Sequence, residues 1–178
     1  SKQPNILFIM SDDHARQRIS AYADNEVPTP GIDRLAEEGA RFDQAFCTNS
    51  ICAPSRAAIL TGTYNHKNGV RTLYDEFDGN RNNVAKVMQK HGYETAIIGK
   101  WHLGTEAPYL PTGFDHYAVL RGQGPYYDPE FITQDGSEFD QGYTTELITE
   151  RSIDWLNSRD GDKPFLLFCH HKAPHRNW

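Results

Sequence analysis

The chain has 178 residues, of which 38% are hydrophobic and 12% are aromatic. This composition excludes a disordered chain, and the length is sufficient for one domain with a buried core. No apolar run approaches the roughly 20 residues of a membrane span, so we expect none. The 18 Lys and Arg against 24 Asp and Glu give a net charge of -6, which argues against a nucleic-acid partner. Three cysteines are too few for a disulfide framework.

Apolar runs between polar residues predict buried strands, and apolar residues at helical spacing predict helices. In chain order, the predicted elements are a strand over 5–10, a helix from Pro30 that is capped by Thr29 and ended by Gly39, a strand-like segment over 40–46, a helix from Pro54 or Ser55 to Thr61, a helix from Asn82 or Asn83 through His91, a strand over 93–98, a helix from Thr144 or Thr145, and a strand over 165–169. The Gly-, Pro- and Tyr-rich stretch 105–143 predicts long surface excursions. The alternation of strands with helices predicts an α/β fold with a largely parallel sheet flanked by helices.

Clusters of polar residues follow three of the predicted strands. Sites in parallel sheets form at the carboxyl ends of strands, so we expect these clusters to share one site. The clusters are Asp12-Asp13, Lys100-Trp101-His102 and His170-His171-Lys172-Ala173-Pro174-His175.

The adjacent acids Asp12 and Asp13 have two interpretations. Hard cations bind several carboxylate oxygens, and two acids at a strand end can face one ion. A solvated loop or a helix cap is the alternative. The pair on its own therefore does not decide between a metal site and a surface loop.

Cys52 differs from Cys47 and Cys169, which we interpret as small core residues. Cys52 lies just before a predicted helix, where free N–H groups and the helix dipole favour an anion. Arg56 adds a planar guanidinium that suits a tetrahedral oxyanion. Cys52 and Arg56 together therefore predict an anion pocket.

Lys100 and His102 are two residues apart in an extended stretch, which places a cation and a titratable base on the same side. A turn with a surface lysine is the alternative. The three histidines at 170, 171 and 175 would also suit zinc, but the sequence offers no matching Cys or Glu-rich partner set. Anion recognition with acid catalysis is therefore the preferred interpretation.

Three motifs in this order resemble the type I, formylglycine-dependent sulfatases of the alkaline-phosphatase-like superfamily. They are Asn5-Ile6-Leu7-Phe8-Ile9-Met10-Ser11-Asp12-Asp13, Cys52-x-Pro54-Ser55-Arg56 followed by Leu60-Thr61-Gly62, and Gly92-Tyr93-x-Thr95-x-x-Ile98-Gly99-Lys100-Trp101-His102. The resemblance covers essentially the whole chain and implies an alkaline-phosphatase-like α/β fold. Family members need a further Asp/Asn pair and a Lys beyond the His175 motif. We therefore expect 1–178 to be the N-terminal part of the catalytic domain, without a separate second domain and inactive on its own.

The resemblance also implies a modified residue and a metal. Cys52 matches the cysteine that a formylglycine-generating or anaerobic maturase enzyme oxidises to Cα-formylglycine. Asp12 and Asp13 match ligands of a calcium ion, which the modified residue 52 also contacts. Magnesium is the alternative metal.

Four further residues match the family's catalytic machinery. Arg56 and Lys100 match residues that hold the formylglycine and the sulfate. His102 matches the base near the formylglycine. His175 matches a histidine at the ester oxygen, where it would protonate the leaving alcohol.

The sequence gives less information about the substrate than about the catalytic residues. The stretch 121–140 carries aromatic and polar groups that suit a sugar, and a long exposed loop has the same composition. We predict that His171 and Lys172 contact the substrate, with packing or surface roles as the alternative.

Together these features predict a sulfuric ester hydrolase that removes sulfate from a sulfated carbohydrate, in the degradation of glycosaminoglycans or other glycans. The alternatives are an aryl or choline sulfatase, a phosphonate or phosphate ester hydrolase, and an inactive fragment that acts as a binding module. We expect a periplasmic or secreted protein whose signal peptide has been removed, with a cytoplasmic location as the alternative.

Overall fold

The computed structural model describes residues 3–24, 27–159 and 161–177. In this part of the chain the central feature is a six-stranded sheet with the order β1-β6-β2-β3-β4-β5. The strands are β1 (Ile6–Met10), β2 (Glu94–Lys100), β3 (His116–Leu120), β4 (Glu130–Thr133), β5 (Gly136–Phe139) and β6 (Phe165–His170). The first four in sheet order are parallel, and β4 and β5 are antiparallel. The predicted α/β class with a largely parallel sheet is confirmed.

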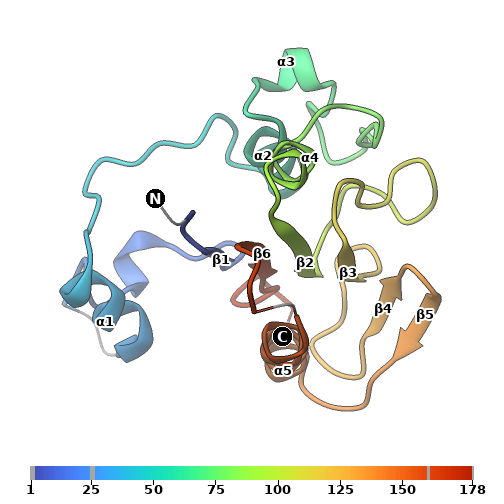
Figure 1. Cartoon of the computed structure of the whole chain (residues 1–178). Helices are drawn as coiled ribbons and strands as arrows, with labels where there is room; N and C mark the ends of the chain where they lie inside the picture. Colours follow the sequence, from blue (N-terminus) through green and yellow to red (C-terminus); the bar gives the residue numbers. More distant parts are fainter. Residues whose placement is uncertain (1–2, 25–26, 160, 178) are drawn as a thin grey trace.

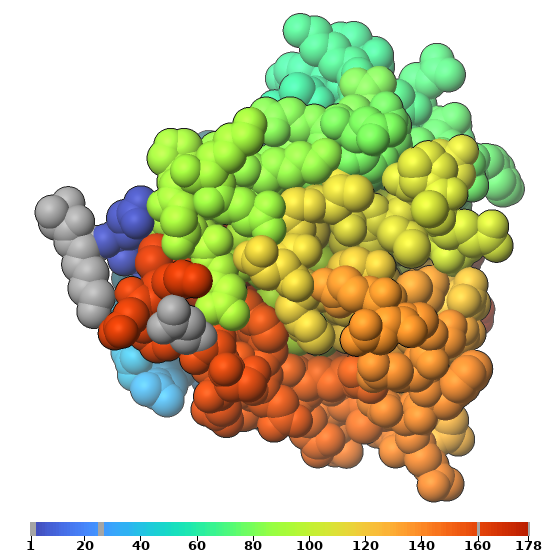
Figure 2. Space-filling model, turned by 45° about the vertical axis from the view of Figure 1, so that its right-hand side comes forward, coloured from blue at the N-terminus to red at the C-terminus, as the bar shows by residue number. Residues whose placement is uncertain are grey.

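The helices are η1 (Arg16–Arg18), α1 (Pro30–Glu38), α2 (Cys52–Thr61), α3 (Asn65–Asn68), α4 (Val84–Lys90) and α5 (Thr144–Ser158). Of these, α2, α4 and α5 pack on the two faces of the sheet. Figure 1 shows α2 and α4 on one side of the sheet and α5 on the other. In the space-filling view, α4, the strands β3 to β5 and α5 belong to one continuous packed face, coloured green through red (Figure 2).

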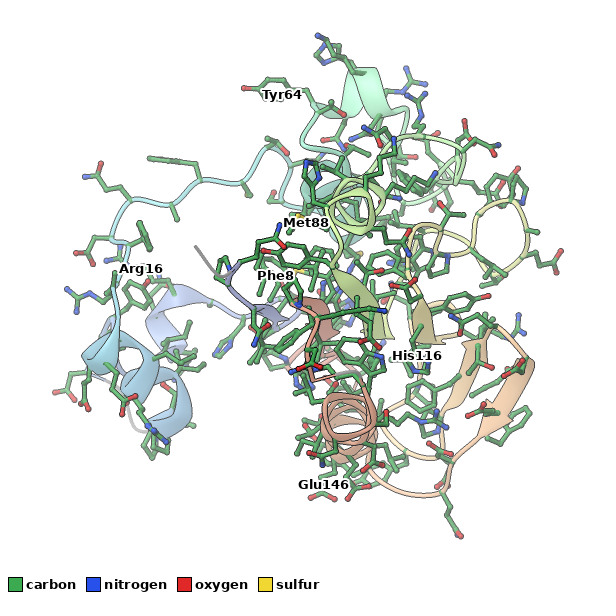
Figure 3. The ribbon with its side chains drawn as sticks, in the orientation of Figure 1. Phe8, Arg16, Tyr64, Met88, His116 and Glu146 are labelled. Carbon is green, nitrogen blue, oxygen red and sulfur yellow. The ribbon has the colours of Figure 1, made fainter. Side chains whose placement is uncertain are left out.

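Two hydrophobic clusters result because successive side chains of a strand point to opposite faces. On the α2 and α4 side, Ile97 and Phe168 pack with Leu60, and Phe8 and Met88 extend this cluster, as their positions in Figure 3 indicate. On the other side, the apolar residues of α5 pack against the sheet: they are Ile148 and Trp155, together with Ile98, Leu167 and Cys169 of the strands.

Gly99 brings the carboxyl ends of β2 and β6 into close contact. It lies opposite His170 in the parallel pair and has a φ of +104°. A Cβ atom at position 99 would lie 2.0 Å from the His170 carbonyl oxygen. Only glycine fits there, and its absence of a side chain lets two polar strand ends approach each other.

The chain between β1 and α2 differs from this compact part. Figure 1 shows α1 and the chain that leads to α2 extending away from the sheet. No residue of α1 is buried, and Leu35, Phe42 and Phe46 have exposed fractions of 64%, 72% and 90%. Thr29 precedes α1 as predicted, but its hydroxyl bonds Ser20 and Asp33 and not a backbone N–H of the helix.

Two predictions of secondary structure are wrong. Residues 40–46 form no strand, because this exposed segment lies beside no other strand that would satisfy its backbone groups. The stretch 105–143 is more than a surface excursion, since it contributes β3, β4 and β5 to the sheet. Among the described helices, none has the length and apolar character that crossing a membrane requires.

Candidate active site

The three polar clusters meet at one edge of the sheet, as the strand ends predict. Asp12 follows β1, Lys100 ends β2 and His170 ends β6, and these strands are neighbours in the order β1-β6-β2. Backbone hydrogen bonds join the loops: the Asp12 N–H donates to the Ala173 carbonyl at 3.1 Å, and the His171 N–H donates to the Met10 carbonyl at 2.8 Å. β2 and β6, which end in Lys100 and His170, are buried along nearly their whole length, whereas β1 is half-exposed.

The first turn of α2 faces this edge. The helix begins at Cys52, and the residue before it, Ile51, provides no side-chain cap. N–H groups at the start of a helix favour an anion. A cleft of about 690 Å³ opens in front of this turn. Its lining includes, from four separate segments of the chain, Asp12, Asp13, Cys52, Ser55, Arg56, Gln123 and His175.

Three charged side chains form a buried cluster at the base of the cleft. The Asp12 carboxylate pairs through Oδ2 with Arg56 Nη2 at 3.1 Å and with Lys100 Nζ. The exposed fractions of the Asp12, Arg56 and Lys100 side chains are 8%, 3% and 0%. Charges at such depth require partners, and two cations against one carboxylate leave an excess of positive charge. The base of the cleft therefore favours an anion.

The pKa values of this cluster follow from burial and pairing. Burial by itself would raise the pKa of Asp12, but the Lys100 hydrogen bond and the Arg56 charge outweigh it and lower that pKa. Burial lowers the pKa of Lys100 in spite of its contact with Asp12. Asp12 is thus held as a carboxylate by the two cations.

His170 and the Lys100 backbone complete the environment of Arg56. Arg56 Nη1 donates to the Lys100 carbonyl oxygen at 2.6 Å and lies 3.2 Å from His170 Nδ1. His170 is 2% exposed and packs against Phe8 and Phe168. Sequence reasoning placed His170 in a cluster but gave it no contact with Arg56, which lies 114 positions away. The position of α2 at the carboxyl ends of β2 and β6 brings these two residues together.

His102 and His175 belong to different loops, and of the two only His175 is among the residues that line the cleft. His102 has a φ of +54°, and its buried Nδ1 has no hydrogen-bond partner among the described residues. Burial, with the charges of Lys100 and Arg56, lowers the pKa of His102 to about 4, so its ring is neutral at pH 7. His175 lines the cleft, and its carbonyl oxygen accepts a hydrogen bond from the Tyr126 hydroxyl at 2.5 Å.

The other two predicted substrate residues lie outside the cleft lining. His171 Nε2 is 3.5 Å from Cys169 Sγ, on the α5 side of the sheet. Lys172 is 5% exposed, and its ammonium lies 4.8 Å from the centre of the Tyr126 ring. A cation over an aromatic face is a packing arrangement. Their contact with a substrate stays a prediction.

The donor atoms at the cleft decide whether a metal ion fits this site. In the described ranges, no group of three or more His, Cys, Asp and Glu side chains is arranged to hold a metal. Asp12 and Asp13 nevertheless bring carboxylates, the ligands that a hard cation prefers, to one side of the cleft beside Cys52. Asp13 has a φ of +60°, a conformation rare outside glycine that is found at functional sites. The donor chemistry fits calcium, although two carboxylates supply fewer than its usual six to eight oxygens.

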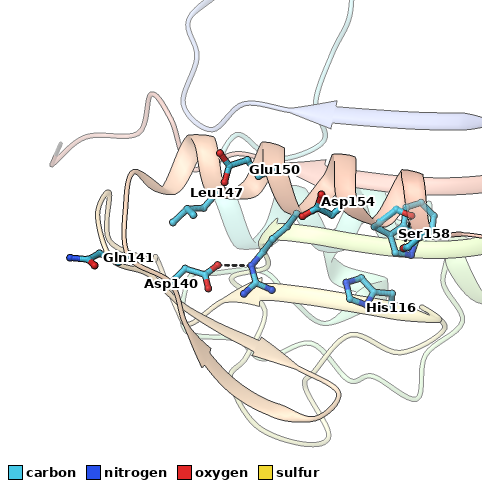
Figure 4. A pocket seen from close by; sticks show the side chains of 9 residues that line it. His116, Asp140, Gln141, Leu147, Glu150, Asp154 and Ser158 are labelled. Atoms are coloured by element: carbon cyan, nitrogen blue, oxygen red, sulfur yellow. Dashed lines mark hydrogen bonds and ion pairs between the residues drawn. The ribbon is translucent and has the colours of Figure 1, made fainter.

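A second hollow lies beside α5, as Figure 4 shows. Its volume is about 600 Å³, and it contains none of the predicted site residues. Arg151 lines this hollow and pairs with Asp140, with an Nε to Oδ2 distance of 2.7 Å. Glu150 and Asp154 add two further acids to the lining, so acids outnumber Arg151 and the hollow does not suit an anion.

The comparison with known families agrees with this arrangement. The family model described as Sulfatase matches residues 4–178. The chain therefore belongs to the sulfatase family.

Individual proteins and a solved structure show which sulfatases the chain resembles. The N-acetylglucosamine-6-O-sulfatase of Bacteroides thetaiotaomicron is 47% identical over 181 residues, which cover 100% of this chain and 32% of that protein. A solved structure in complex with its substrate D-glucosamine-2-N,6-O-disulfate has a TM-score of 0.95 and 47% identity, and covers 99% of this chain and 36% of that one. Arylsulfatase H of Canis lupus familiaris is 38% identical over 140 residues, which cover 67% of this chain and 25% of that protein. The chain thus spans about a third of the first two, and the predicted alkaline-phosphatase-like fold is confirmed.

Proposed function

We propose that this chain carries the sulfate-binding and nucleophile part of an enzyme that hydrolyses sulfate esters of carbohydrates. The observation that supports it best is the buried cluster of Asp12, Arg56 and Lys100, which leaves excess positive charge beside Cys52 at the first turn of α2. The 47% identical relative is named for action on N-acetylglucosamine 6-O-sulfate. A 6-O-sulfated amino sugar is therefore the proposed substrate.

The proposal includes a maturase as partner and calcium as cofactor, with magnesium as the alternative. Formylglycine made from Cys52 is an aldehyde, and its hydrate would supply a hydroxyl nucleophile, while the cation would neutralise sulfate charge. Asp12 and Asp13 are the proposed ligands of the cation, together with residue 52. Both cations that contact Asp12 use Oδ2, which leaves Oδ1 as the oxygen for the metal.

Arg56 and Lys100 bind and orient the sulfate in this proposal. Each is held before substrate arrives: Arg56 by Asp12 and the Lys100 carbonyl, and Lys100 by Asp12 and Gln123. Fixed cations in a site that excludes water stabilise developing negative charge without reorganisation. The burial of Arg56 and Lys100 therefore contributes to catalysis in this proposal.

Two histidines perform the proton transfers. His102 is neutral at pH 7 because burial lowers its pKa to about 4, so it can accept a proton in the cleft. His175 approaches from the opposite loop, which suits donation of a proton to the oxygen of the leaving alcohol. His171 and Lys172 remain the proposed substrate contacts, and neither is among the residues that line the cleft.

A substrate panel tests the proposal in a protein of full length. In a chimera, this chain replaces the matching segment of the Bacteroides thetaiotaomicron N-acetylglucosamine-6-O-sulfatase. We expect the chimera, coexpressed with a maturase, to hydrolyse 6-O-sulfated N-acetylglucosamine in preference to an aryl sulfate or an aryl phosphodiester. Preference for either aryl ester would contradict the proposed substrate and favour the corresponding alternative enzyme.

Modification and location have separate tests. Peptide mass analysis of the chimera is expected to find residue 52 at the lower mass of formylglycine. Sulfated glycans are too polar to cross a bilayer unaided, so we place the enzyme in the periplasm or outside the cell. Activity confined to the cytoplasmic fraction of the source cells would contradict that location.

A further inference from the structure

We propose that Gln123 is a positioning residue that fixes the Lys100 ammonium in the anion site without adding charge to it. Gln123 Oε1 accepts a hydrogen bond from Lys100 Nζ at 2.6 Å, and Gln123 lines the same cleft as Cys52 and Arg56. The part of this inference that concerns sulfate rests on the proposed function. The part that concerns the position of Lys100 does not.

Lys100 needs such a restraint because its side chain is long and flexible. An ammonium has three donors, and ordering a lysine side chain costs conformational entropy. In the described structure its partners are Asp12 Oδ2 on one side and Gln123 Oε1 on the other. Two acceptors from different loops hold the ammonium at one point, which a single ion pair would not do.

The loop that carries Gln123 is shaped to reach this point. Lys100 and Leu120 are direct partners in the β2–β3 pair, so the chain that leaves β3 passes beside Lys100. Gly124 has a φ of +69°, and a Cβ atom there would lie 2.7 Å from Leu120 Cδ1. The turn therefore folds tightly back on β3. The Tyr126 hydroxyl bonds the His175 carbonyl and anchors the far side of the loop to the other wall of the site.

An amide and a carboxylate at position 123 would have opposite effects on an anion. Both accept a hydrogen bond from Lys100, and they have nearly the same shape. The buried cluster has Arg56 and Lys100 against Asp12, so one further carboxylate would cancel its excess positive charge. Charges a few ångström apart in a poorly solvated site interact strongly. Gln123 thus supplies the acceptor and preserves the charge.

The first test measures the position of Lys100 in the 178-residue chain by amine labelling with acetic anhydride and mass spectrometry. Gln123→Met removes the acceptor, and we expect Lys100 to react about tenfold faster, because a charge-assisted hydrogen bond is lost. Gln123→Glu keeps the acceptor, and the labelling rate should not rise. The exposed Lys90 is the internal standard for folding and reagent. Equal Lys100 rates in the parent and Gln123→Met would overturn the inference.

The second test measures the charge, with inorganic sulfate as the probe and calorimetry at constant ionic strength. We expect Gln123→Glu to bind sulfate at least about tenfold more weakly than the parent. Gln141→Glu is the matched control, because it adds the same charge at an exposed position beside α5 and outside the cleft lining (Figure 4). If Gln123→Glu binds sulfate as tightly as Gln141→Glu does, the charge argument is overturned.

The two tests separate this inference from the proposed function. If the parent binds sulfate and the Gln123 variants match it in both tests, the inference fails and the anion site stands. If the parent does not bind sulfate, the proposed anion site fails. The labelling result then decides alone whether Gln123 holds Lys100.

Discussion

Among the hollows in the described part of the molecule, the cleft at the strand ends and the hollow beside α5 are similar in size, and each contains an arginine paired with an aspartate. In the cleft at the strand ends, Arg56 and Asp12 are 3% and 8% exposed, whereas Arg151 and Asp140 beside α5 are 22% and 27% exposed. The cleft has excess buried cations, and the hollow beside α5 has excess acids in contact with water. The same pair of residue types therefore belongs to a buried, positively charged cluster in one place and to a partly exposed ion pair in the other. The two sites differ because Arg56 and Asp12 are more deeply buried and because Lys100 adds a third charge to them.

The largest effect on the free energy of unfolding is expected at Asp12. Asp12→Asn leaves Arg56 and Lys100 buried without a carboxylate, and removal of one partner from a buried ion pair costs about 3–5 kcal/mol. We expect the free energy of unfolding, measured by urea titration at pH 7, to fall by that amount. A decrease below about 1 kcal/mol would place the pair with exposed ion pairs and contradict the role of burial.

Arg56→Lys tests geometry at constant charge. Lysine has a single donor nitrogen, which cannot occupy both of the positions from which the two Nη atoms of Arg56 bond Asp12 and the Lys100 carbonyl. We expect kcat of the chimera on its 6-O-sulfated substrate to fall about 100-fold, the loss typical of a misplaced charge-stabilising group. Arg151→Lys, the matched change beside α5, should leave kcat near that of the unaltered chimera. Equal losses in the two variants would indicate a general loss of folding.

The pH dependence of stability reports on His102. Its pKa falls to about 4 in the folded chain, so between about pH 6.5 and pH 4 the unfolded chain takes up a proton that the folded chain does not. The stability associated with neutral His102 is fully present above pH 6.5 and is lost as the pH falls toward 4. His102→Gln should make the free energy of unfolding less dependent on pH in this window. An unchanged dependence would contradict burial of a neutral ring.

The smallest effect is expected beside α5. Asp140→Asn leaves Arg151 paired with Glu138 Oε2 at 2.8 Å and with access to water. We expect the free energy of unfolding to fall by less than about 1 kcal/mol. A loss as large as that of Asp12→Asn would show that the two hollows do not differ in the way proposed.

Much of this arrangement could be predicted from the sequence because it depends on local patterns. Short apolar runs indicate the buried strands, and their carboxyl ends place Asp12, Lys100 and His175 together. Strand alternation also explains His171, which points to the opposite face from His170 and toward Cys169. The strand-like pattern over 40–46 failed because strand formation needs a neighbouring strand, which a local pattern does not supply.

The residues that sequence reasoning missed act through contacts distant in the chain. Gln123 lies 23 positions from Lys100, and His170 lies 114 positions from Arg56. Neither contact has a motif or a periodicity of its own. The glycines at 99 and 124 were the available signal, because Gly99 allows a close approach to the His170 backbone and Gly124 has a positive φ that favours glycine.

The central claim is that this cleft is a sulfate-ester site whose nucleophile derives from Cys52. The most direct measurement is the turnover of 6-O-sulfated N-acetylglucosamine by the chimera, compared with its Cys52→Ala variant at equal protein concentration. The account predicts turnover by the unaltered chimera and none above the uncatalysed rate by the variant. Substantial turnover by the purified Cys52→Ala chimera would contradict it.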